Sequence, residues 1–164
     1  MKESFRVAVS GSEYTFCGSH FLVFADGETS EPLHGHDYRT TVEVIGPIDS
    51  ATGWVVDFLV LKSVVQKHIR PLDHRTLLPE QSPYLKITCV EESIEVVAPD
   101  RRWTIPQADC SMLPIAATTT ELIAQFLARS IHADLVAQGA ETLDSLEVTL
   151  EESGGFRAAC CIEF

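Results

Sequence analysis

The stretch GETSEPLHGHDYRTTVEV, residues 27–44, sets two histidines one residue apart immediately before an alternating, β-branched run. The run YRTTVEVI (38–45) predicts a strand. Side chains two residues apart in an extended chain point to the same side, so His34 and His36 can direct both imidazoles at one point. This geometry fits a metal chelate. The same spacing also suits surface or capping histidines, so the pair alone leaves both interpretations open.

A third imidazole can come from His20, which lies in FCGSHF (16–21), if this segment pairs with or crosses residues 34–38. Three histidine nitrogens with an open fourth position are typical of catalytic zinc, whereas structural zinc is normally closed by four protein ligands. The set of His20, His34 and His36 is therefore a candidate catalytic zinc site.

Hydrophobic periodicity predicts two helices. The first covers residues 58–69 and ends before Pro71, because proline disfavours helix in the residue ahead of it. The second begins at TTTE (118–121), where a threonine caps the helix, and ends before Gly139. Further strands are expected over residues 4–9, 146–152 and 156–164, the last two joined by a tight Ser153-Gly154-Gly155 turn.

Residues 84–105 contain extended segments around two turns, and we interpret them as a hairpin inserted ahead of the second helix. Strand runs separated by helices indicate an α+β fold, with an antiparallel sheet and the helices on one of its faces. The chain has 164 residues, 45% of them hydrophobic, and shows no internal repeat or linker. These properties predict a single domain spanning residues 1–164.

The charge balance limits the expected partners. Twelve Lys and Arg against 24 Asp and Glu give a formal net charge of −12, which repels nucleic acid and anionic membranes. Five cysteines without C-x-x-C spacing suggest no disulfide framework, and no signal-like or membrane-spanning apolar run is present. We therefore expect a soluble, cytoplasmic protein with no nucleic-acid or membrane partner. An anionic small substrate would need a local basic patch, which the sequence does not place.

Two acidic residues, Asp73 and Glu152, are further candidates for functional roles. Asp73 and His74 are adjacent in a loop after the first helix, where an aspartate that orients an imidazole makes a proton-transfer unit. A simple Asx turn at the helix end is the alternative. Glu152 shares the strand parity of the apolar Val148 and Leu150, so it should point inward. A buried carboxylate is costly unless paired, which suggests that Glu152 is a ligand anchor or that the register is off by one residue.

Six fragments in this order resemble the 6-pyruvoyl-tetrahydropterin synthase and 6-carboxy-tetrahydropterin synthase family. They are FCGSH, LHGHDY, TGWVVDF (52–58), PLDH (71–74), TTTE (118–121) and VTLEES (148–153). The resemblance covers most of the chain, although the insertion at about residues 84–113 is longer than in compact members of the family.

The resemblance implies the tunnelling fold, in which each subunit gives a four-stranded antiparallel sheet with two helices on one side. Three subunits close a barrel, and two trimers stack into a hexamer. It also implies roles for the residues already singled out: zinc ligands His20, His34 and His36, proton relay Asp73 and His74, and pterin anchor Glu152 with Thr119 and Thr120. The anchor has a chemical reason, because a carboxylate can accept the two parallel N–H donors of a pterin's 2-amino-4-oxo edge.

One departure from the family pattern concerns the nucleophile. Members that make the pyruvoyl or carboxy product carry a catalytic cysteine four residues before the first histidine of H-G-H, and this chain has Ser30 there. Cys17 lies at an odd offset from His20, so it should face away from the zinc and pack in the core. Glu31 gives the pattern E-x-x-H-G-H and resembles the branch in which a glutamate replaces the cysteine. A solvated loop acid is the alternative for Glu31.

The resemblance therefore implies a zinc-dependent lyase that cleaves the side chain of 7,8-dihydroneopterin triphosphate and gives 6-hydroxymethyl-7,8-dihydropterin, with Glu31 as the base. A second hypothesis has Asp73 and His74 acting alone to give a pyruvoyl- or carboxy-tetrahydropterin product. A third is a homologue that binds zinc and pterin but has lost catalysis together with its cysteine.

Overall fold

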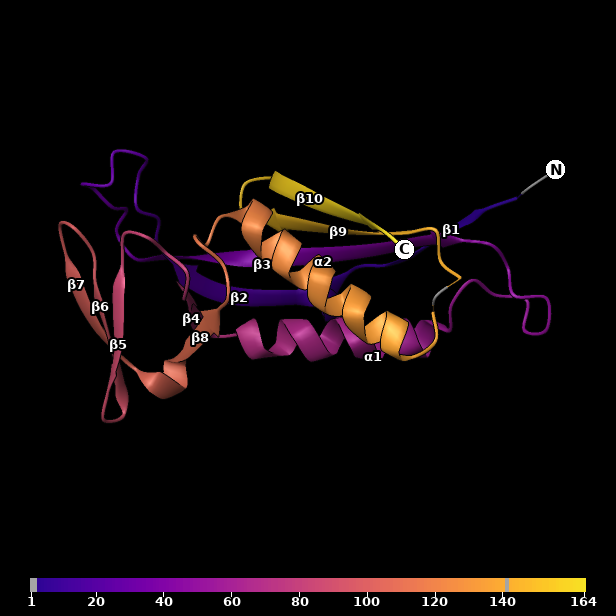
Figure 1. Cartoon of the computed structure of the whole chain (residues 1–164), viewed down its shortest axis with the longest axis horizontal. Coiled ribbons are helices and arrows are strands. Elements are labelled where there is room, and N and C mark those ends of the chain that lie inside the picture. Colours follow the sequence, from indigo (N-terminus) through magenta and orange to yellow (C-terminus); the bar gives the residue numbers. More distant parts are fainter. Residues whose placement is uncertain (1–2, 141) are drawn as a thin grey trace.

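The computed structural model describes residues 3–140 and 142–164 and has ten strands and two α-helices (Figure 1). The strands are β1 (Phe5–Val9), β2 (Thr15–His20), β3 (His34–Gly46), β4 (Arg75–Pro79), β5 (Lys86–Val90), β6 (Ser93–Val97), β7 (Arg102–Pro106), β8 (Cys110–Leu113), β9 (Ser145–Glu152) and β10 (Phe156–Glu163). The helices are α1 (Phe58–Ile69), α2 (Thr120–Ala137) and the short 3-10 turns η1 (Ser12–Tyr14), η2 (Arg70–Leu72) and η3 (Gln107–Asp109).

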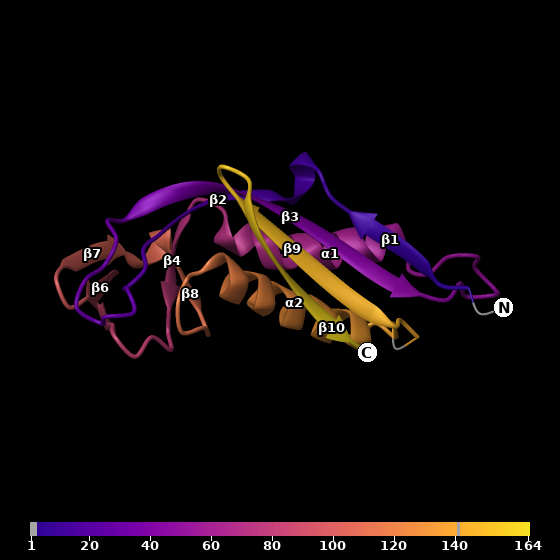
Figure 2. The ribbon, with the colours of Figure 1, turned by 90° about the horizontal axis from the view of Figure 1, so that it is seen from above.

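Strand β3 organises the main sheet. Its 13 residues pair with β2 at one end, with β1 at the other, and with β9 along the opposite edge. Alternate β3 side chains, including Tyr38, Val42 and Val44, are fully buried on the face that α1 and α2 cover (Figure 2). The other face carries the intervening side chains, and no α-helix of the described residues lies over it.

Both helices lie where the sequence predicts them. Helix α1 has the predicted bounds, and the Asp57 carboxylate caps it by accepting the Leu59 N–H. Helix α2 is capped by the Thr119 hydroxyl, which accepts the Leu122 N–H, and Gly139 with a φ of 84° follows its end. Both predicted helices are therefore confirmed, as are the threonine cap and the following glycine of α2, whereas the Asp57 cap of α1 was not predicted. Within the described part of the chain, neither helix combines the length and apolarity that a membrane crossing requires.

The main sheet is larger than the four antiparallel strands expected. It has seven strands in the order β10-β9-β3-β2-β4-β8, and β1 also pairs with β3. The pairs among β10, β9, β3 and β2 are antiparallel, but β4 runs parallel to β2 and β8 runs parallel to β4. The description as a purely antiparallel four-stranded sheet is thus wrong in its extent. Strands β4 and β8 are short, and the buried run of β4 lacks the alternation that marks a strand in a sequence.

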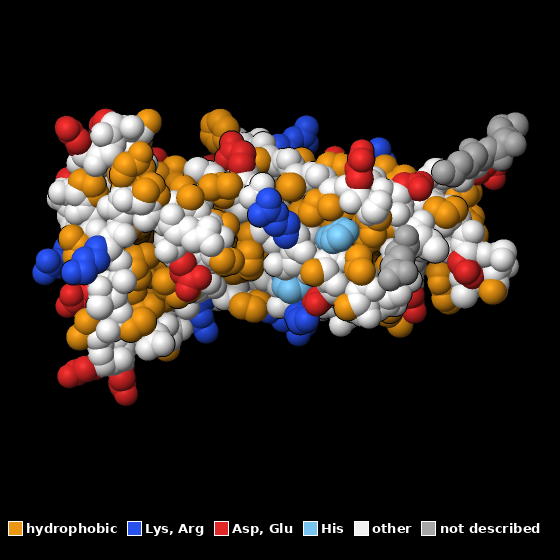
Figure 3. Space-filling model, viewed as in Figure 1, with side chains coloured by type: hydrophobic (Ala, Val, Ile, Leu, Met, Phe, Trp, Pro, Cys, Tyr) orange, Lys and Arg blue, Asp and Glu red, His pale blue; other side chains and the backbone are white. Residues whose placement is uncertain are grey.

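The insertion is a three-stranded antiparallel sheet, β5-β6-β7, and not a hairpin. It forms a second hydrophobic core with Phe21, Leu78, Ile94 and Val96, and Trp103 packs against this core. In Figure 1 this sheet stands at the end of the molecule away from the chain termini. Figure 3 shows exposed hydrophobic side chains along it, acidic side chains at its lower tip and Lys or Arg side chains at its left edge. The predicted insertion extends to about residue 113 and so includes β8. In the structure β8 pairs with β4 and belongs to the main sheet.

Candidate active site

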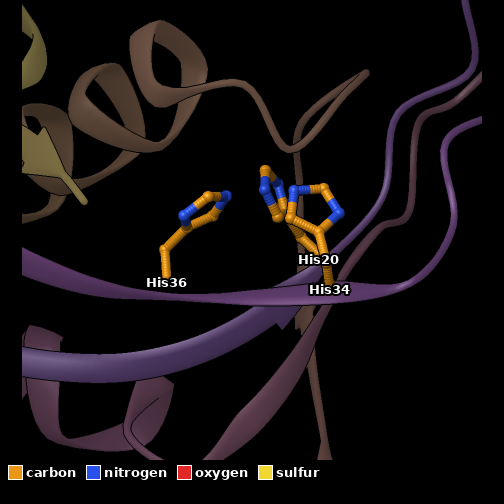
Figure 4. Close-up of side chains that lie close together, drawn as sticks. All are labelled: His20, His34 and His36. Carbon is orange, nitrogen blue, oxygen red and sulfur yellow. The ribbon is translucent and has the colours of Figure 1, made fainter. Parts of the chain in front are cut away.

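Three histidines meet where β2 ends and β3 begins. In the antiparallel pairing, His20 lies opposite His34 and Gly18 lies opposite His36, so the three imidazoles share one face (Figure 4). The ring centroids are 4.8 Å apart for His20 and His34, 5.1 Å for His20 and His36, and 4.8 Å for His34 and His36. One nitrogen from each ring lies within 4.8 Å of the other two. The pairing of residues 16–21 with 34–38, on which the third ligand depended, is therefore present.

The hydrogen bonds of two rings determine their tautomers. Nδ1 of His20 bonds the Thr118 carbonyl at 2.8 Å, and Nδ1 of His34 bonds the Pro32 carbonyl at 2.8 Å. A carbonyl can only accept, so each Nδ1 carries the proton and each Nε2 keeps its lone pair. Burial lowers the pKa of His20, which keeps the ring neutral near pH 7. Its Nε2 is buried without a hydrogen-bond partner among the described residues. This buried, unpaired nitrogen of His20, close to a ring nitrogen of each of the other two histidines, fits a divalent metal ion.

The histidines open into a pocket of about 340 Å³. Its lining residues are His20, Leu22, Glu31, His34, His36, Thr119, Thr120, Glu121, Glu152, Phe156, Arg157 and Ala158. The Thr120 hydroxyl donates to Glu152 Oε2 at 2.8 Å. The other carboxylate oxygen, Oε1, has no part in this hydrogen bond and can accept a further one. The Thr119 hydroxyl is engaged in capping α2. The structure therefore places Glu152, Thr119 and Thr120 in the pocket of the histidines, and their role as a pterin anchor stays a prediction.

Glu31 and Ser30 differ sharply in their surroundings. Glu31 lines the pocket of the histidines. Ser30 is 4% exposed and is not among the lining residues, and its hydroxyl donates to the Asp100 carboxylate. Ser30, at the cysteine position of the family pattern, is thus hydrogen-bonded to Asp100 outside the pocket. The neighbouring Glu31 lines the pocket.

Asp73 and His74 pair with each other but lie outside this pocket. Nδ1 of His74 is 2.9 Å from Asp73 Oδ2, and Asp73 Oδ1 accepts the Cys17 N–H at 2.9 Å. This backbone hydrogen bond is the main cause of the lowered pKa of Asp73. Both line a separate hollow with Cys17, Asp37 and neighbouring residues, and the His74 side chain is 79% exposed. Within one chain, the expected relay pair is therefore formed but is not brought to the histidines.

Cys17 faces away from the histidines as its offset predicts, but the expectation that it packs in the core is wrong. It is exposed, because the face of β2 on which it lies is not covered by a helix. Desolvation and the neighbouring Asp37 raise the pKa of its thiol, which disfavours the thiolate. Cys17 therefore does not replace the missing cysteine at the site.

Sequence reasoning missed several lining residues. Glu121 was noted only as part of a helix cap, and Leu22, Phe156 and Ala158 carry no chemical signal in the sequence. Arg157 is the one Lys or Arg among the residues that line the pocket. Its proximity to the turn after Glu152 is the only sequence feature that could have pointed to it.

A sheet with two helices on one face and three imidazoles at the start of its longest strand define a protein of the tunnelling fold. The family model of 6-pyruvoyl tetrahydropterin synthase matches residues 11–160, so the chain belongs to this family. Its activity is accordingly of the pterin-synthase type.

Relatives in the family differ in their products. A protein of Methanocaldococcus jannaschii assigned as 6-carboxy-5,6,7,8-tetrahydropterin synthase is 28% identical over 145 residues, 88% of this chain and 87% of the relative. The dihydroneopterin monophosphate aldolase of Pyrococcus furiosus is 48% identical over 50 residues, 30% of this chain and 42% of the relative.

The fold is shared with the crystal structure of Plasmodium vivax 6-pyruvoyl tetrahydropterin synthase. The TM-score is 0.91 at 27% identity, over 99% of this chain and 100% of that one. A variant of the P. vivax enzyme, in which a glutamate described as a catalytic residue is replaced by alanine, has a TM-score of 0.90 at 26% identity and the same coverage.

We expect removal of one imidazole to abolish metal binding. His20→Ala and His36→Ala should each lower the metal content, measured by elemental analysis after dialysis, from about one ion per chain to near zero, because two imidazoles leave the ion mostly hydrated. His132, which packs on Phe164 away from the site, provides the control, and His132→Ala should keep its metal. Full metal content in both site variants would contradict a three-histidine centre.

Proposed function

We propose that the chain is a zinc-dependent lyase that cleaves the side chain of a phosphorylated 7,8-dihydroneopterin and releases 6-hydroxymethyl-7,8-dihydropterin. The observation that carries the proposal is the presence of a carboxylate, Glu31, in the pocket of the three imidazoles, where no thiol lines the pocket. The catalytic glutamate of the P. vivax enzyme and the aldolase activity of the P. furiosus relative support the same reading.

Glu152 fixes the pterin ring in this proposal. The ring's 2-amino group and adjacent ring N–H form a pair of donors that one carboxylate can accept. Thr120 holds one Glu152 oxygen from the N-terminus of α2, which limits the carboxylate's rotation. The fixed ring then places its side chain toward the histidines, and such positioning supplies a large part of a barrier reduction.

His20, His34 and His36 would hold the zinc ion, and three protein ligands would leave a position for the substrate. When bound there, zinc supplies a Lewis acid that makes the hydroxyl groups of the side chain more acidic.

Glu31 acts as the general base. It takes the proton from the hydroxyl on the second carbon of the side chain, and that oxygen forms a carbonyl as the bond between the first and second carbons breaks. The electron pair of the broken bond passes to the first carbon, where conjugation with the pterin ring delocalises it. A proton returned to that carbon completes 6-hydroxymethyl-7,8-dihydropterin, and the two-carbon aldehyde leaves with the phosphate.

The phosphate end of the substrate needs a cation in this acidic chain. Arg157 lines the pocket and belongs to none of the ion pairs found among the described residues. A guanidinium can bind phosphate oxygens in a bidentate manner. We assign the binding of the substrate phosphate to Arg157.

Asp73 and His74 would act from a neighbouring copy. The pair is formed and solvent-exposed, yet it lies outside the pocket of its own chain. A hexamer built as two stacked trimers, as the family resemblance implies, would let one copy complete the pocket of another. The pair would then return the proton to the first carbon. If the pair alone does the acid–base work, the product is a pyruvoyl- or carboxy-tetrahydropterin, the activity assigned to the M. jannaschii relative.

The product decides between these functions. The zinc-loaded protein is incubated separately with 7,8-dihydroneopterin monophosphate and triphosphate, and products are identified by mass. We expect 6-hydroxymethyl-7,8-dihydropterin and a phosphorylated two-carbon aldehyde. A pyruvoyl or carboxy product would favour the pair alone, and binding of pterin without turnover of either substrate would identify an inactive homologue.

Replacing Glu31 tests its role as the base. Glu31→Ala should lower kcat by about 100-fold or more, because general bases contribute on this order, while zinc content and pterin affinity stay as in the unmodified protein. Glu28, an acid in the same loop that does not line the pocket, is the control, and Glu28→Ala should keep full turnover. Unchanged kcat in Glu31→Ala would remove Glu31 from the chemistry.

Subunit complementation tests the placement of Asp73 and His74. His20→Ala and His74→Ala should each be inactive alone, because one lacks the metal site and the other the relay. Co-expressed and randomly mixed, they should recover about a quarter of full activity, since some pockets then combine an intact part from each copy. Mixed assemblies no more active than the separate variants would show that the pair does not serve a neighbour's pocket.

A further inference from the structure

The inserted sheet makes two contacts with residues that are next in sequence to residues lining the pocket. Trp103 of β7 stacks on Phe21 with ring centroids 4.1 Å apart and an interplanar angle of 26°. Phe21 directly follows His20, and it is 2% exposed within the second core. The insertion therefore packs against the residue next to a candidate metal ligand.

The second contact is polar. Asp100, in the turn between β6 and β7, accepts the Ser30 hydroxyl at 2.5 Å and is held by the Arg101 guanidinium at 2.9 Å. Ser30 is 70 residues away in the sequence and directly precedes Glu31. The insertion thus also touches the residue next to the proposed base.

The Asp100 carboxylate stays ionised under ordinary conditions. Hydrogen bonds from Arg101 and then from Ser30 hold the pKa of Asp100 at about 2, below its usual value of 3.8. A depressed pKa means that the contact persists above the usual value and is lost only as the pH falls toward 2. The hydrogen bond from Ser30 to the charged Asp100 carboxylate is therefore present throughout the pH range from about 5 to about 8.

The segment between this contact and the metal site is short. The Glu31 N–H donates to the Leu22 carbonyl at 2.8 Å, and Val23 and Ser30 form an isolated antiparallel bridge. After Glu31, only Pro32 and Leu33 precede His34. The backbone at Ser30 and Glu31 is thus held by its pairing with Leu22 and Val23. The Asp100 contact fixes the side chain of Ser30, immediately before Glu31.

We propose that Asp100 is a positioning residue, which acts through the Ser30 hydroxyl to hold Glu31 in its working position against the three imidazoles. The inference rests on the proposed role of Glu31 as the base. It gives the insertion a function, because the insertion supplies the carboxylate that anchors the catalytic loop. It also accounts for serine at the cysteine position, since the hydroxyl there serves as the anchor point and not as a nucleophile.

Substitution of Asp100 tests this inference in the zinc-loaded protein with the substrate that turns over. Asp100→Ala should lower kcat by about 10- to 100-fold, as loss of supporting hydrogen bonds around a site typically does, with KM and zinc content unchanged. Asp100→Asn, which keeps an acceptor for Ser30, should recover part of the loss. Asp109, an exposed acid in the same insertion without a side-chain hydrogen bond among the described residues, is the control, and Asp109→Asn should behave as the unmodified protein.

A second measurement separates positioning of Glu31 from general support of the fold. In a Glu31→Ala background, Asp100→Ala should cause no further loss of kcat, because the residue through which it acts is absent. The loss in the Glu31-containing protein should also be the same from about pH 5 to about pH 8, because Asp100 is ionised throughout.

Three results would overturn the inference. They are an unchanged kcat in Asp100→Ala, a fall in kcat accompanied by loss of zinc or by a lowered unfolding temperature that accounts for it, and an undiminished effect in the Glu31→Ala background. Each of these can occur while Glu31→Ala still lowers kcat by about 100-fold or more, in which case the proposed function stands and Asp100 has no positioning role. An active Glu31→Ala protein would instead remove the proposed function itself.

Discussion

The site depends on the register in which β2 pairs with β3. With His20 opposite His34, the three imidazoles lie on one face and their free nitrogens converge. A shift of one residue would move His20 to the other face of the sheet, because strand side chains alternate. The register is secured by the core, since Phe16 of β2 stacks on Tyr38 of β3 at 4.8 Å, next to the histidines on the same face. Hydrophobic packing of the sheet therefore determines where the polar chemistry occurs.

The two faces of this sheet have different tasks. The face under α1 and α2 is the core, and it ends in the pocket at the N-terminus of α2, where Thr119 caps the helix and Thr120 holds Glu152. The uncovered face carries Cys17, Asp37 and the Asp73–His74 pair. A single chain therefore separates the pocket of the histidines from the exposed Asp73–His74 pair, and this separation is the reason that assembly matters for the proposed mechanism.

The insertion packs against the loop between β2 and β3. A loop that carries a catalytic carboxylate must be ordered, and loops far from a core are ordered poorly by their own contacts. Here a second small core brings Trp103 onto Phe21 and Asp100 onto Ser30. The loop is consequently held between the main sheet and the inserted sheet, with Glu31 on its pocket side.

The sequence by itself determined what depends on neighbours along the chain: the bounds of α1 and α2, the threonine cap of α2, the strand character of β1, β3, β9 and β10, and the parity that aligns His34 with His36. These follow from local periodicity and capping chemistry. The strand parity of Glu152 with Val148 and Leu150 also predicted that it points inward, and the structure places it among the residues that line the pocket.

Tertiary structure alone decided which distant segments meet. It added β4 and β8 in parallel, made the insertion a three-stranded sheet, left Cys17 exposed, and kept Asp73 and His74 out of the pocket of their own chain. It also joined Ser30 to Asp100 across 70 residues. Such contacts have no periodic signature in the sequence, because they arise from the packing of whole elements against each other and not from the conformation of any one of them.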